Sequence, residues 1–266
     1  MKKMSRKGRA DFPENVDREW FHTAFSDDYL RLYAHRNDEE AERQVESAVK
    51  LVPFQAGQAV LDIACGSGRH MRAFARKGAR VTGIDLSPVL VKAARGRSSK
   101  EGLHVVVCCG DMRDMAYREE FDGTTVWFTS LGYFAAVSED RKAIRRLAAA
   151  LKPGGWWWID LANPGYVEAN IIPHSRRMID GVEGRAEVTE ERRLVGRRVE
   201  KRIHIVDGLG PRTYLESVRL YRPEEFGPLI KAAGLKTDGV LGDYDGRALT
   251  KDAPRQIWYG HKPRGR

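Results

Sequence analysis

Residues 60–70 read VLDIACGSGRH. An apolar run containing one aspartate gives way to the bend Gly66-Ser67-Gly68, and a basic, helix-compatible stretch follows. Glycines at such a bend let a ligand approach the backbone closely. The bend lacks the Gly-Lys-Ser/Thr ending of a P-loop. It also lacks the third small residue of a dinucleotide-binding motif, because Met71 stands in that position.

Strand and helix patterns alternate on both sides of this bend. Ser87 suits a helix cap and Pro88 suits the first helical turn. Such alternation predicts βαβ units and a parallel sheet covered on both faces, with Trp157 on the opposite face from Trp156 and Trp158. We expect strands at 59–64, 80–85, 104–108, 121–128 and 156–161, helices at 38–52 (capped by Asp38), 69–77, 88–98 and 139–151, and a turn at 152–155.

The pattern changes after Asn163-Pro164-Gly165. Residues 185–221 alternate like three antiparallel strands, joined at Gly196 and at 208–210. The α/β rhythm then returns with a helix at 222–233 and strands near 235–241 and 255–261. We therefore expect a basic flexible tail (1–16), a helical lid (17–56), an α/β core (57–164 and 223–266) and an antiparallel cap over the acceptor pocket (165–222).

Net charge and cysteine content restrict the partners that we expect. The chain has 266 residues and a net charge of +9, of which five positive charges lie in the first ten residues and three in the last six. Solvated tails explain this excess, although tethering to RNA or another polyanion is the alternative. The N-terminus has no apolar signal segment, and no apolar run is long enough for a membrane span. Three unpaired cysteines indicate a reducing, cytoplasmic location.

Three acidic residues lie in, at the end of, or just after the first three predicted strands. Asp62 lies within the first strand, Asp85 ends the second, and Gly110-Asp111-Met112 follows the third. A carboxylate at the end of the second strand can accept both ribose hydroxyls, and an acid after the third can pair with an adenine amino group. Together the runs at 60–68 (VLDIACGSG), 81–88 (VTGIDLSP), 110–112 (GDM), 121–134 (FDGTTVWFTSLGYF) and 151–164 (LKPGGWWWIDLANP) resemble the class I S-adenosylmethionine-dependent methyltransferases.

The resemblance implies an α/β fold with a seven-stranded, mostly parallel sheet, helices on both faces and a last strand that runs antiparallel. It also implies S-adenosylmethionine as cofactor, S-adenosylhomocysteine as product, and no metal. The implied contacts are Asp62, Ala64, Cys65, Gly66, Gly68 and His70 to the methionine part, Asp85 and Leu86 to the ribose and base, Asp111 and Met112 to the adenine, and Phe128, Thr129 and Ser130 at the methyl-transfer face.

The stretch DDYLRLYAHRN (27–37) contains Tyr29, Tyr33 and Arg36. In small-molecule members of the family such a helix covers the cofactor, with tyrosines facing the sulfonium and an arginine on the carboxylate. Aromatic faces suit a cation, and a guanidinium suits a carboxylate. The alternative is an amphipathic helix that uses the same tyrosines for packing alone.

The acceptor is less well specified. The end of the fourth strand reads Trp127-Phe128-Thr129-Ser130, so the Asn-Pro-Pro-Tyr signature of base amino methylation is missing there. We expect a small or mid-sized metabolite methylated at O, N or C. Candidate acceptor-binding residues are Tyr133, Arg192, Ser217 and Arg219, with Arg202 and Tyr221 as further pocket candidates, and candidate catalytic residues are Tyr29, His204 and Tyr244.

Two other functions stay open at this point. One is methylation of RNA or protein recruited by the basic tails, and the other is a cofactor-binding regulator without transfer activity. For the leading hypothesis we expect a small-molecule acceptor, no nucleic acid, no membrane, and a monomer or homodimer.

Overall fold

The computed structural model describes residues 16–264, so nearly all of the predicted tail lies outside the described residues. Seven strands form one sheet in the order β10-β11-β5-β4-β1-β2-β3, and all neighbours pair in parallel except those of β11, which is antiparallel on both sides. This confirms the expected fold class. The strands are β1 (Ala59–Ile63), β2 (Arg80–Asp85), β3 (Val105–Cys109), β4 (Phe121–Val126), β5 (Leu151–Ala162), β10 (Lys236–Leu241) and β11 (Arg255–His261).

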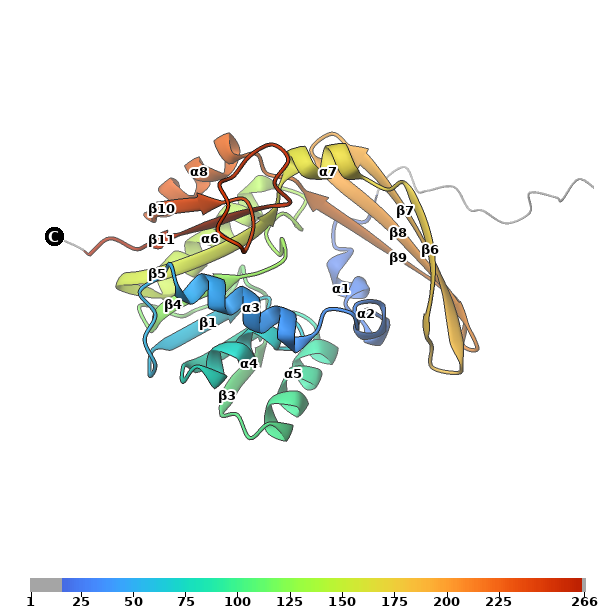
Figure 1. Ribbon diagram of the computed structural model, residues 1–266, viewed down its shortest axis with the longest axis horizontal. Coiled ribbons are helices and arrows are strands. Elements are labelled where there is room, and N and C mark those ends of the chain that lie inside the picture. Colours follow the sequence, from blue (N-terminus) through green and yellow to red (C-terminus); the bar gives the residue numbers. More distant parts are fainter. Residues whose placement is uncertain (1–15, 265–266) are drawn as a thin grey trace, which may run out of the picture.

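Helices cover both faces of this sheet (Figure 1). On one face, α3 (Asp38–Val49), α4 (Arg69–Arg76) and α5 (Pro88–Lys100) pack against Trp156 and Trp158. On the other, α6 (Val137–Ala150) and α8 (Pro223–Ala232) pack against Trp157. Trp157 thus lies on the opposite face from Trp156 and Trp158, which confirms the predicted alternation. All three tryptophans are at most 1% exposed, so their rings belong to the core.

Local details correct two expectations. Asn37, not Asp38, caps α3, because its side chain accepts a hydrogen bond from Glu40 N at 2.8 Å. The turn predicted at 152–155 is an irregular part of β5, where the register with β4 shifts. Ser87 caps α5 as expected, through a 3.2 Å bond from Leu90 N to Ser87 Oγ.

The cap is a separate four-stranded antiparallel sheet rather than three strands. It follows α7 (Pro164–Asn170) and has the order β6-β7-β8-β9, comprising β6 (His174–Asp180), β7 (Arg185–Val195), β8 (Arg198–Asp207) and β9 (Gly210–Arg219). The aromatic-rich N-terminal segment forms α1 (Phe21–Ala24) and α2 (Asp27–Leu32), helical in pieces as expected. Figure 1 shows these two helices between the core sheet and the cap sheet.

Helix α2 is fastened to the cap sheet by apolar packing. Leu32 is buried with Ala186, Val188, Ile203 and Ile205 in one cluster. The cap therefore supports the back of the lid helix. Among residues 16–264, no helix has the length and apolar character that a membrane crossing requires.

Candidate functional site

Two adjoining cavities lie where β1, β2, β3 and β4 end at their carboxyl termini. The empty space of the first, cavity A, is about 600 Å³ and that of the second, cavity B, about 880 Å³, both counted with the solvent at their open mouths. Cavity A is lined by Phe21, Phe25, Ile84, Asp85, Leu86, Leu90, Gly110, Asp111, Met112 and Phe134; cavity B by Leu30, Tyr33, Ala34, Arg36, Cys65, Ser67, Arg69, His70, Arg97, Trp127 and Phe128; both share Tyr29, Ala64, Gly66, Ser130 and Tyr133. Most of the residues that the sequence assigned to a cofactor therefore meet at one place.

The bend after β1 has backbone angles that favour glycine. Gly66 and Gly68 have φ of 56° and 79°, and Ala64 also has a positive φ of 55°. A Cβ on Gly68 would lie 2.9 Å from Met71 Cε and 3.1 Å from Ala94 Cβ, so the bend packs tightly against α4 and α5. This geometry leaves the backbone of the bend facing both cavities.

Asp85 braces this bend from the end of β2. Its Oδ2 accepts a hydrogen bond from Gly66 N at 2.8 Å, and its Oδ1 accepts one from Ser87 N at 2.9 Å. The residue is 7% exposed, and burial raises the pKa of its carboxyl. A carboxylate has about four lone-pair sites, so Asp85 can still accept two hydroxyl groups from a ligand in cavity A.

Asp62 lies deeper, in β1, and one of its oxygens has no protein partner. Thr125 Oγ1 donates to Asp62 Oδ1 at 2.8 Å, whereas Oδ2 is buried and without a hydrogen bond. Burial raises the pKa of this carboxyl to about 7. A buried acceptor left open in this way costs free energy unless a ligand or water satisfies it.

Asp111 is already engaged by a neighbour. Arg113 donates to it from Nη2 at 2.6 Å and from its backbone N at 2.7 Å. Burial raises the pKa of Asp111, but these bonds from Arg113 outweigh burial and hold the pKa below its usual value. Asp111 is therefore a charged group on the wall of cavity A.

The lid contributes an aromatic and cationic wall to cavity B. The guanidinium carbon of Arg36 lies 4.2 Å from the ring centre of Tyr33 and 4.9 Å from that of Phe128. Arg36 Nη1 also donates to the Tyr29 hydroxyl at 3.4 Å. Burial raises the pKa values of Tyr29, Tyr33 and Tyr133, so these hydroxyls stay protonated at neutral pH.

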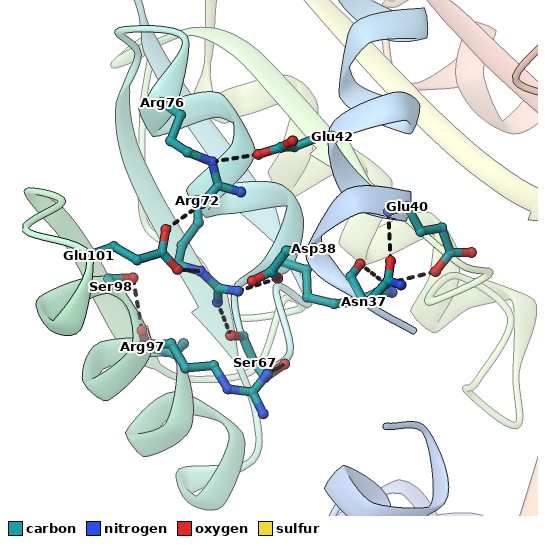
Figure 2. A network of polar contacts seen from close by, with 12 residues as sticks. Asn37, Asp38, Glu40, Glu42, Ser67, Arg72, Arg76, Arg97, Ser98 and Glu101 are labelled. Carbon is teal, nitrogen blue, oxygen red and sulfur yellow. Dashed lines mark hydrogen bonds and ion pairs between the residues drawn. The ribbon is translucent and has the colours of Figure 1, made fainter. Parts of the chain in front are cut away.

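A buried arginine network fixes the bend relative to the lid. Figure 2 shows Arg72 of α4 pointing between α3 and the bend. Arg72 Nη1 donates to the Ser67 carbonyl at 3.0 Å, Arg72 Nε lies 2.8 Å from Glu101 Oε1, and Nη2 pairs with Asp38. One side chain thus connects the start of α3, the bend and the end of α5.

Comparisons with known proteins match this architecture. The family model described as "Methyltransferase domain" matches residues 60–155. The dTDP-3-amino-3,6-dideoxy-alpha-D-glucopyranose N,N-dimethyltransferase of Streptomyces fradiae is 30% identical over 202 residues, which cover 73% of this chain and 76% of that protein. The chain belongs to the class I S-adenosylmethionine-dependent methyltransferases. It is an enzyme, and its cofactor is S-adenosylmethionine.

Other relatives of this methyltransferase act on different acceptors. The ubiquinone biosynthesis O-methyltransferase of Chromobacterium violaceum is 32% identical over 187 residues, covering 70% of this chain and 68% of that protein. A methyltransferase structure from Clostridium acetobutylicum superposes with a TM-score of 0.74 at 19% identity, covering 89% of this chain and 96% of that one. A sugar N-methyltransferase from Streptoalloteichus superposes with a TM-score of 0.68 at 20% identity, covering 98% and 100%.

The residues of the methyltransferase suit S-adenosylmethionine. The open oxygen of Asp62 suits an ammonium group, and the Asp85 carboxylate suits a pair of ribose hydroxyls. Arg36 suits a carboxylate, since among residues 16–264 it forms no ion pair with an acidic side chain.

His70 lines cavity B but is held from behind. Its Nε2 lies 2.7 Å from Gln44 Oε1, and its ring stacks on Trp127 with 4.2 Å between the ring centres. Burial holds the pKa of His70 well below its usual value, so the imidazole is neutral. His70 is thus an uncharged part of the wall.

The structure places the predicted cap residues outside both cavities. His204 bonds Thr213 Oγ1 at 2.9 Å and lines a separate surface cavity with Arg202. Side chains alternate between the faces of a strand, and Arg202, His204, Ser217 and Arg219 share the face opposite to Ile203. Arg192 donates to Ser175 Oγ at 3.2 Å, Ser217 accepts from Arg198 Nε at 2.7 Å, Arg219 donates to the Ala135 carbonyl at 3.4 Å, and Tyr221 donates to Asp140 Oδ2 at 2.7 Å.

Two cap residues that the sequence reasoning missed contact the lid instead. Glu216 Oε1 accepts from the Tyr33 hydroxyl at 3.2 Å, and Lys201 Nζ lies 2.8 Å from Glu216 Oε2. Lys201 also bonds the Tyr33 hydroxyl directly. Lys201, Ile203 and Ile205 are spaced by two residues and therefore share one face of β8. The two apolar residues in this series indicate that the face points inward.

Two predicted residues at the end of the core strands also lie outside both cavities. The Tyr244 hydroxyl donates to Asp160 Oδ2 at 2.6 Å, so the structure places it against the core sheet and not in the wall of either cavity. Thr129 Oγ1 accepts from Ala162 N at 2.8 Å, so this side chain supports β5 rather than lining the methyl-transfer face.

Proposed function

We propose that this methyltransferase transfers the methyl group of S-adenosylmethionine to the nitrogen of a small-molecule amine. The sulfonium supplies an activated methyl group, so the residues of the chain mainly align the two reactants. The proposed contacts to the nucleoside in cavity A are Asp85, Leu86, Asp111 and Met112. Those around the amino-acid tail are Arg36, Ala64, Cys65, Gly66 and His70 in the wall of cavity B, with Asp62 and Gly68, which line neither cavity, beside them in the chain. Those around the sulfur and the acceptor are Tyr29, Tyr33, Ser130 and Tyr133.

The wall of tyrosines where the cavities meet is the observation that carries the choice of nitrogen. Tyr29 and Tyr133 line both cavities, and Tyr33 lines cavity B beside them. Because burial raises their pKa values, the three phenols stay neutral. A neutral phenol oxygen accepts a hydrogen bond from an amine N–H, and the ring faces favour the positive charge that develops on nitrogen.

A carboxylate behind Tyr33 supports the same choice. An amine nitrogen becomes positively charged when it takes a methyl group, and it must lose a proton before a second transfer. Tyr33 lines cavity B, and its hydroxyl donates to Glu216 Oε1 at 3.2 Å and accepts a hydrogen bond from Lys201. A proton that leaves the ammonium can reach Glu216 through the Tyr33 hydroxyl, and Lys201, which contacts both groups, supplies the counter-charge.

The names of the relatives point to the acceptors to test first. Three curated relatives, 29–30% identical, are N,N-dimethyltransferases of dTDP-linked amino sugars, and another at 30% identity is a cypemycin N-terminal methyltransferase. We infer that a nucleotide-linked amino sugar is the leading acceptor class. The α-amine of a peptide is the second candidate, favoured by the cypemycin enzyme alone.

The test is a direct comparison of amine and hydroxyl acceptors. The full chain is incubated with S-adenosylmethionine and a dTDP-linked amino deoxysugar, its hydroxyl counterpart, or a short peptide with a free N-terminus. Mass spectrometry should detect one or two added methyl groups on the amino sugar and none on the hydroxyl sugar. Methylation of the hydroxyl sugar at a comparable rate would contradict the proposal, and methylation of the peptide alone would favour the second candidate.

The proposed setting is the cytoplasm, with a monomer or homodimer as the working form. Cys65, Cys108 and Cys109 are all free thiols, which suits a reducing compartment. Size-exclusion chromatography with light scattering distinguishes monomer from dimer.

A further inference from the structure

Two consecutive residues after β4 have backbone angles that side chains disfavour. Phe128 has a φ of 53° and Thr129 a φ of 64°. This left-handed region is uncommon for any residue with a Cβ, and it is least favourable for β-branched and bulky ones. Such a pair persists only where the surroundings hold it, and it concentrates at functional sites.

Asp160 of β5 is the group that holds this backbone. Phe128 N donates to Asp160 Oδ2 at 2.8 Å, and Thr129 N donates to the Asp160 carbonyl at 2.9 Å. Asp160 is fully buried, at 0% exposure. A single residue thus accepts both amide protons of the strained pair.

Other side chains hold the Asp160 carboxylate in place. Arg255 Nε donates to Oδ1 at 2.7 Å, and the Tyr244 hydroxyl donates to Oδ2 at 2.6 Å. Arg255 Nη2 also lies 3.3 Å from Thr129 Oγ1, which ties the cluster together. A buried charge is tolerated when it is paired and hydrogen-bonded in this way. Asp160 lines neither cavity, and Phe128, which lines cavity B, connects it to that cavity most directly.

The Phe128 ring is the link to cavity B. Arg36 lies with its guanidinium carbon 4.9 Å from the Phe128 ring centre, and Arg69 lies at 5.4 Å from the same centre. The guanidinium carbon of Arg36 also lies 4.2 Å from the Tyr33 ring centre. The guanidinium is thus held between two aromatic rings, and the position of one of them depends on the Asp160 contacts.

We propose that Asp160 is a positioning residue for cofactor binding, which fixes the Phe128 backbone so that its ring aims Arg36 at the carboxylate of the cofactor tail. The proposal rests on the proposed placement of that tail in cavity B. If the role of Asp160 were purely structural, a substitution there would weaken the binding of all ligands. The proposal instead predicts a loss of affinity only for ligands that carry the amino-acid tail.

Two ligands separate these possibilities. S-adenosylhomocysteine has both nucleoside and tail, whereas 5′-methylthioadenosine has the nucleoside and no amino-acid group. We expect Asp160→Asn to weaken S-adenosylhomocysteine binding about tenfold, equivalent to 1.4 kcal/mol, and to change methylthioadenosine binding less than about twofold, both by calorimetry. Tyr244→Phe is the matched control, since it removes a hydroxyl from Asp160 Oδ2 but leaves the bond from Phe128 N, and it should change both affinities less than about twofold.

Phe128→Leu tests the ring itself if Asp160→Asn does not fold. It keeps an apolar side chain but removes the aromatic face, and we expect the same selective loss of S-adenosylhomocysteine affinity. Equal losses for both ligands, or no loss for either in a folded Asp160→Asn or Phe128→Leu protein, would overturn the proposal. Arg36→Gln tests the premise that the tail carboxylate binds Arg36 in cavity B. If this variant binds S-adenosylhomocysteine with unchanged affinity, the placement of the tail is wrong.

Discussion

Replacing Asp28 with asparagine should loosen the contact of the lid helix α2 with the cap sheet, and Asp28 itself lines neither cavity. Asp28 is 5% exposed and lies on α2 facing β9. Arg212 Nε and the Tyr214 hydroxyl each donate to Asp28 Oδ2 at 2.7 Å, and Arg31 pairs with Oδ1. Because Tyr29 lies in α2 and Tyr33 caps its C-terminal end, loosening the helix should also disturb the cofactor cavities.

The magnitude follows from the pKa of Asp28. Burial raises this pKa, but the bonds from Arg212, Tyr214 and Arg31 outweigh burial and lower it from 3.8 to about 2. Each unit corresponds to about 1.36 kcal/mol, so the native interactions of the carboxylate stabilise the fold by about 2 kcal/mol at neutral pH. The stabilisation is present above pH 3.8 and is lost as the pH falls through about 2.

The assay is urea unfolding of wild type, Asp28→Asn and the control Asp27→Asn. Asp27 is the adjacent acidic residue on α2 and is more exposed than Asp28. At pH 7 we expect Asp28→Asn to lose about 2 kcal/mol of unfolding free energy and Asp27→Asn to stay within about 0.5 kcal/mol of wild type. S-adenosylhomocysteine should bind Asp28→Asn more weakly. Equal stability of the two variants at pH 7 would refute the reasoning.

Three further predictions concern the site itself. Asp85→Ala should weaken S-adenosylhomocysteine binding at least tenfold, about 1.4 kcal/mol, in calorimetry, and an unchanged affinity would remove Asp85 from the ribose site. Since burial raises the pKa of Asp62 to about 7, wild-type stability should fall as the pH rises from about 4 through 7, whereas Asp62→Asn should show no such fall in urea unfolding at pH 5 and pH 8. His204→Ala should leave turnover of the true acceptor within about twofold of wild type, and a loss of tenfold or more would restore His204 as a catalytic candidate.

The sequence was informative for the core because its signals are local. Short apolar runs mark the strands, and Asp62, Asp85 and Asp111 lie in or near the ends of these runs. Parallel strands bring such ends together at one edge of the sheet. The bend at 66–68 could be predicted because its positive φ angles favour glycine and because Gly68 packs too closely against Met71 for a side chain. Local patterns of this kind are enough to assign these residues to one site.

The cap was less predictable because its inward face depends on tertiary packing. The sequence analysis assigned Arg202 and His204 to the pocket, whereas Lys201 lies on the inward face. The two assignments differ by one residue, and a difference of one residue along a strand places a side chain on the opposite face. The pattern of Ile203 and Ile205 indicated the correct face, but long charged side chains on both faces obscured it. Strand β6 was missed because HSRRMID has few β-branched residues and lies at the edge of its sheet.

The contacts of Asp160 could not have been read from the sequence. An aspartate in the apolar stretch 156–161 resembles an isolated polar residue, and its partners Arg255 and Tyr244 lie more than eighty positions away. Phe128 and Thr129 have positive φ angles, but neither is a glycine, so the sequence does not indicate this backbone conformation. Contacts between residues so far apart in the sequence can be recognised only when the arrangement of the strands in the sheet is known.

A crystal structure of the S-adenosylhomocysteine complex tests the central claim most directly. The account predicts the nucleoside in cavity A with both ribose hydroxyls within hydrogen-bond distance of Asp85, and the tail carboxylate on Arg36. A complex in which the nucleoside lies outside cavity A, while Asp85 contacts only Gly66 and Ser87, would contradict it.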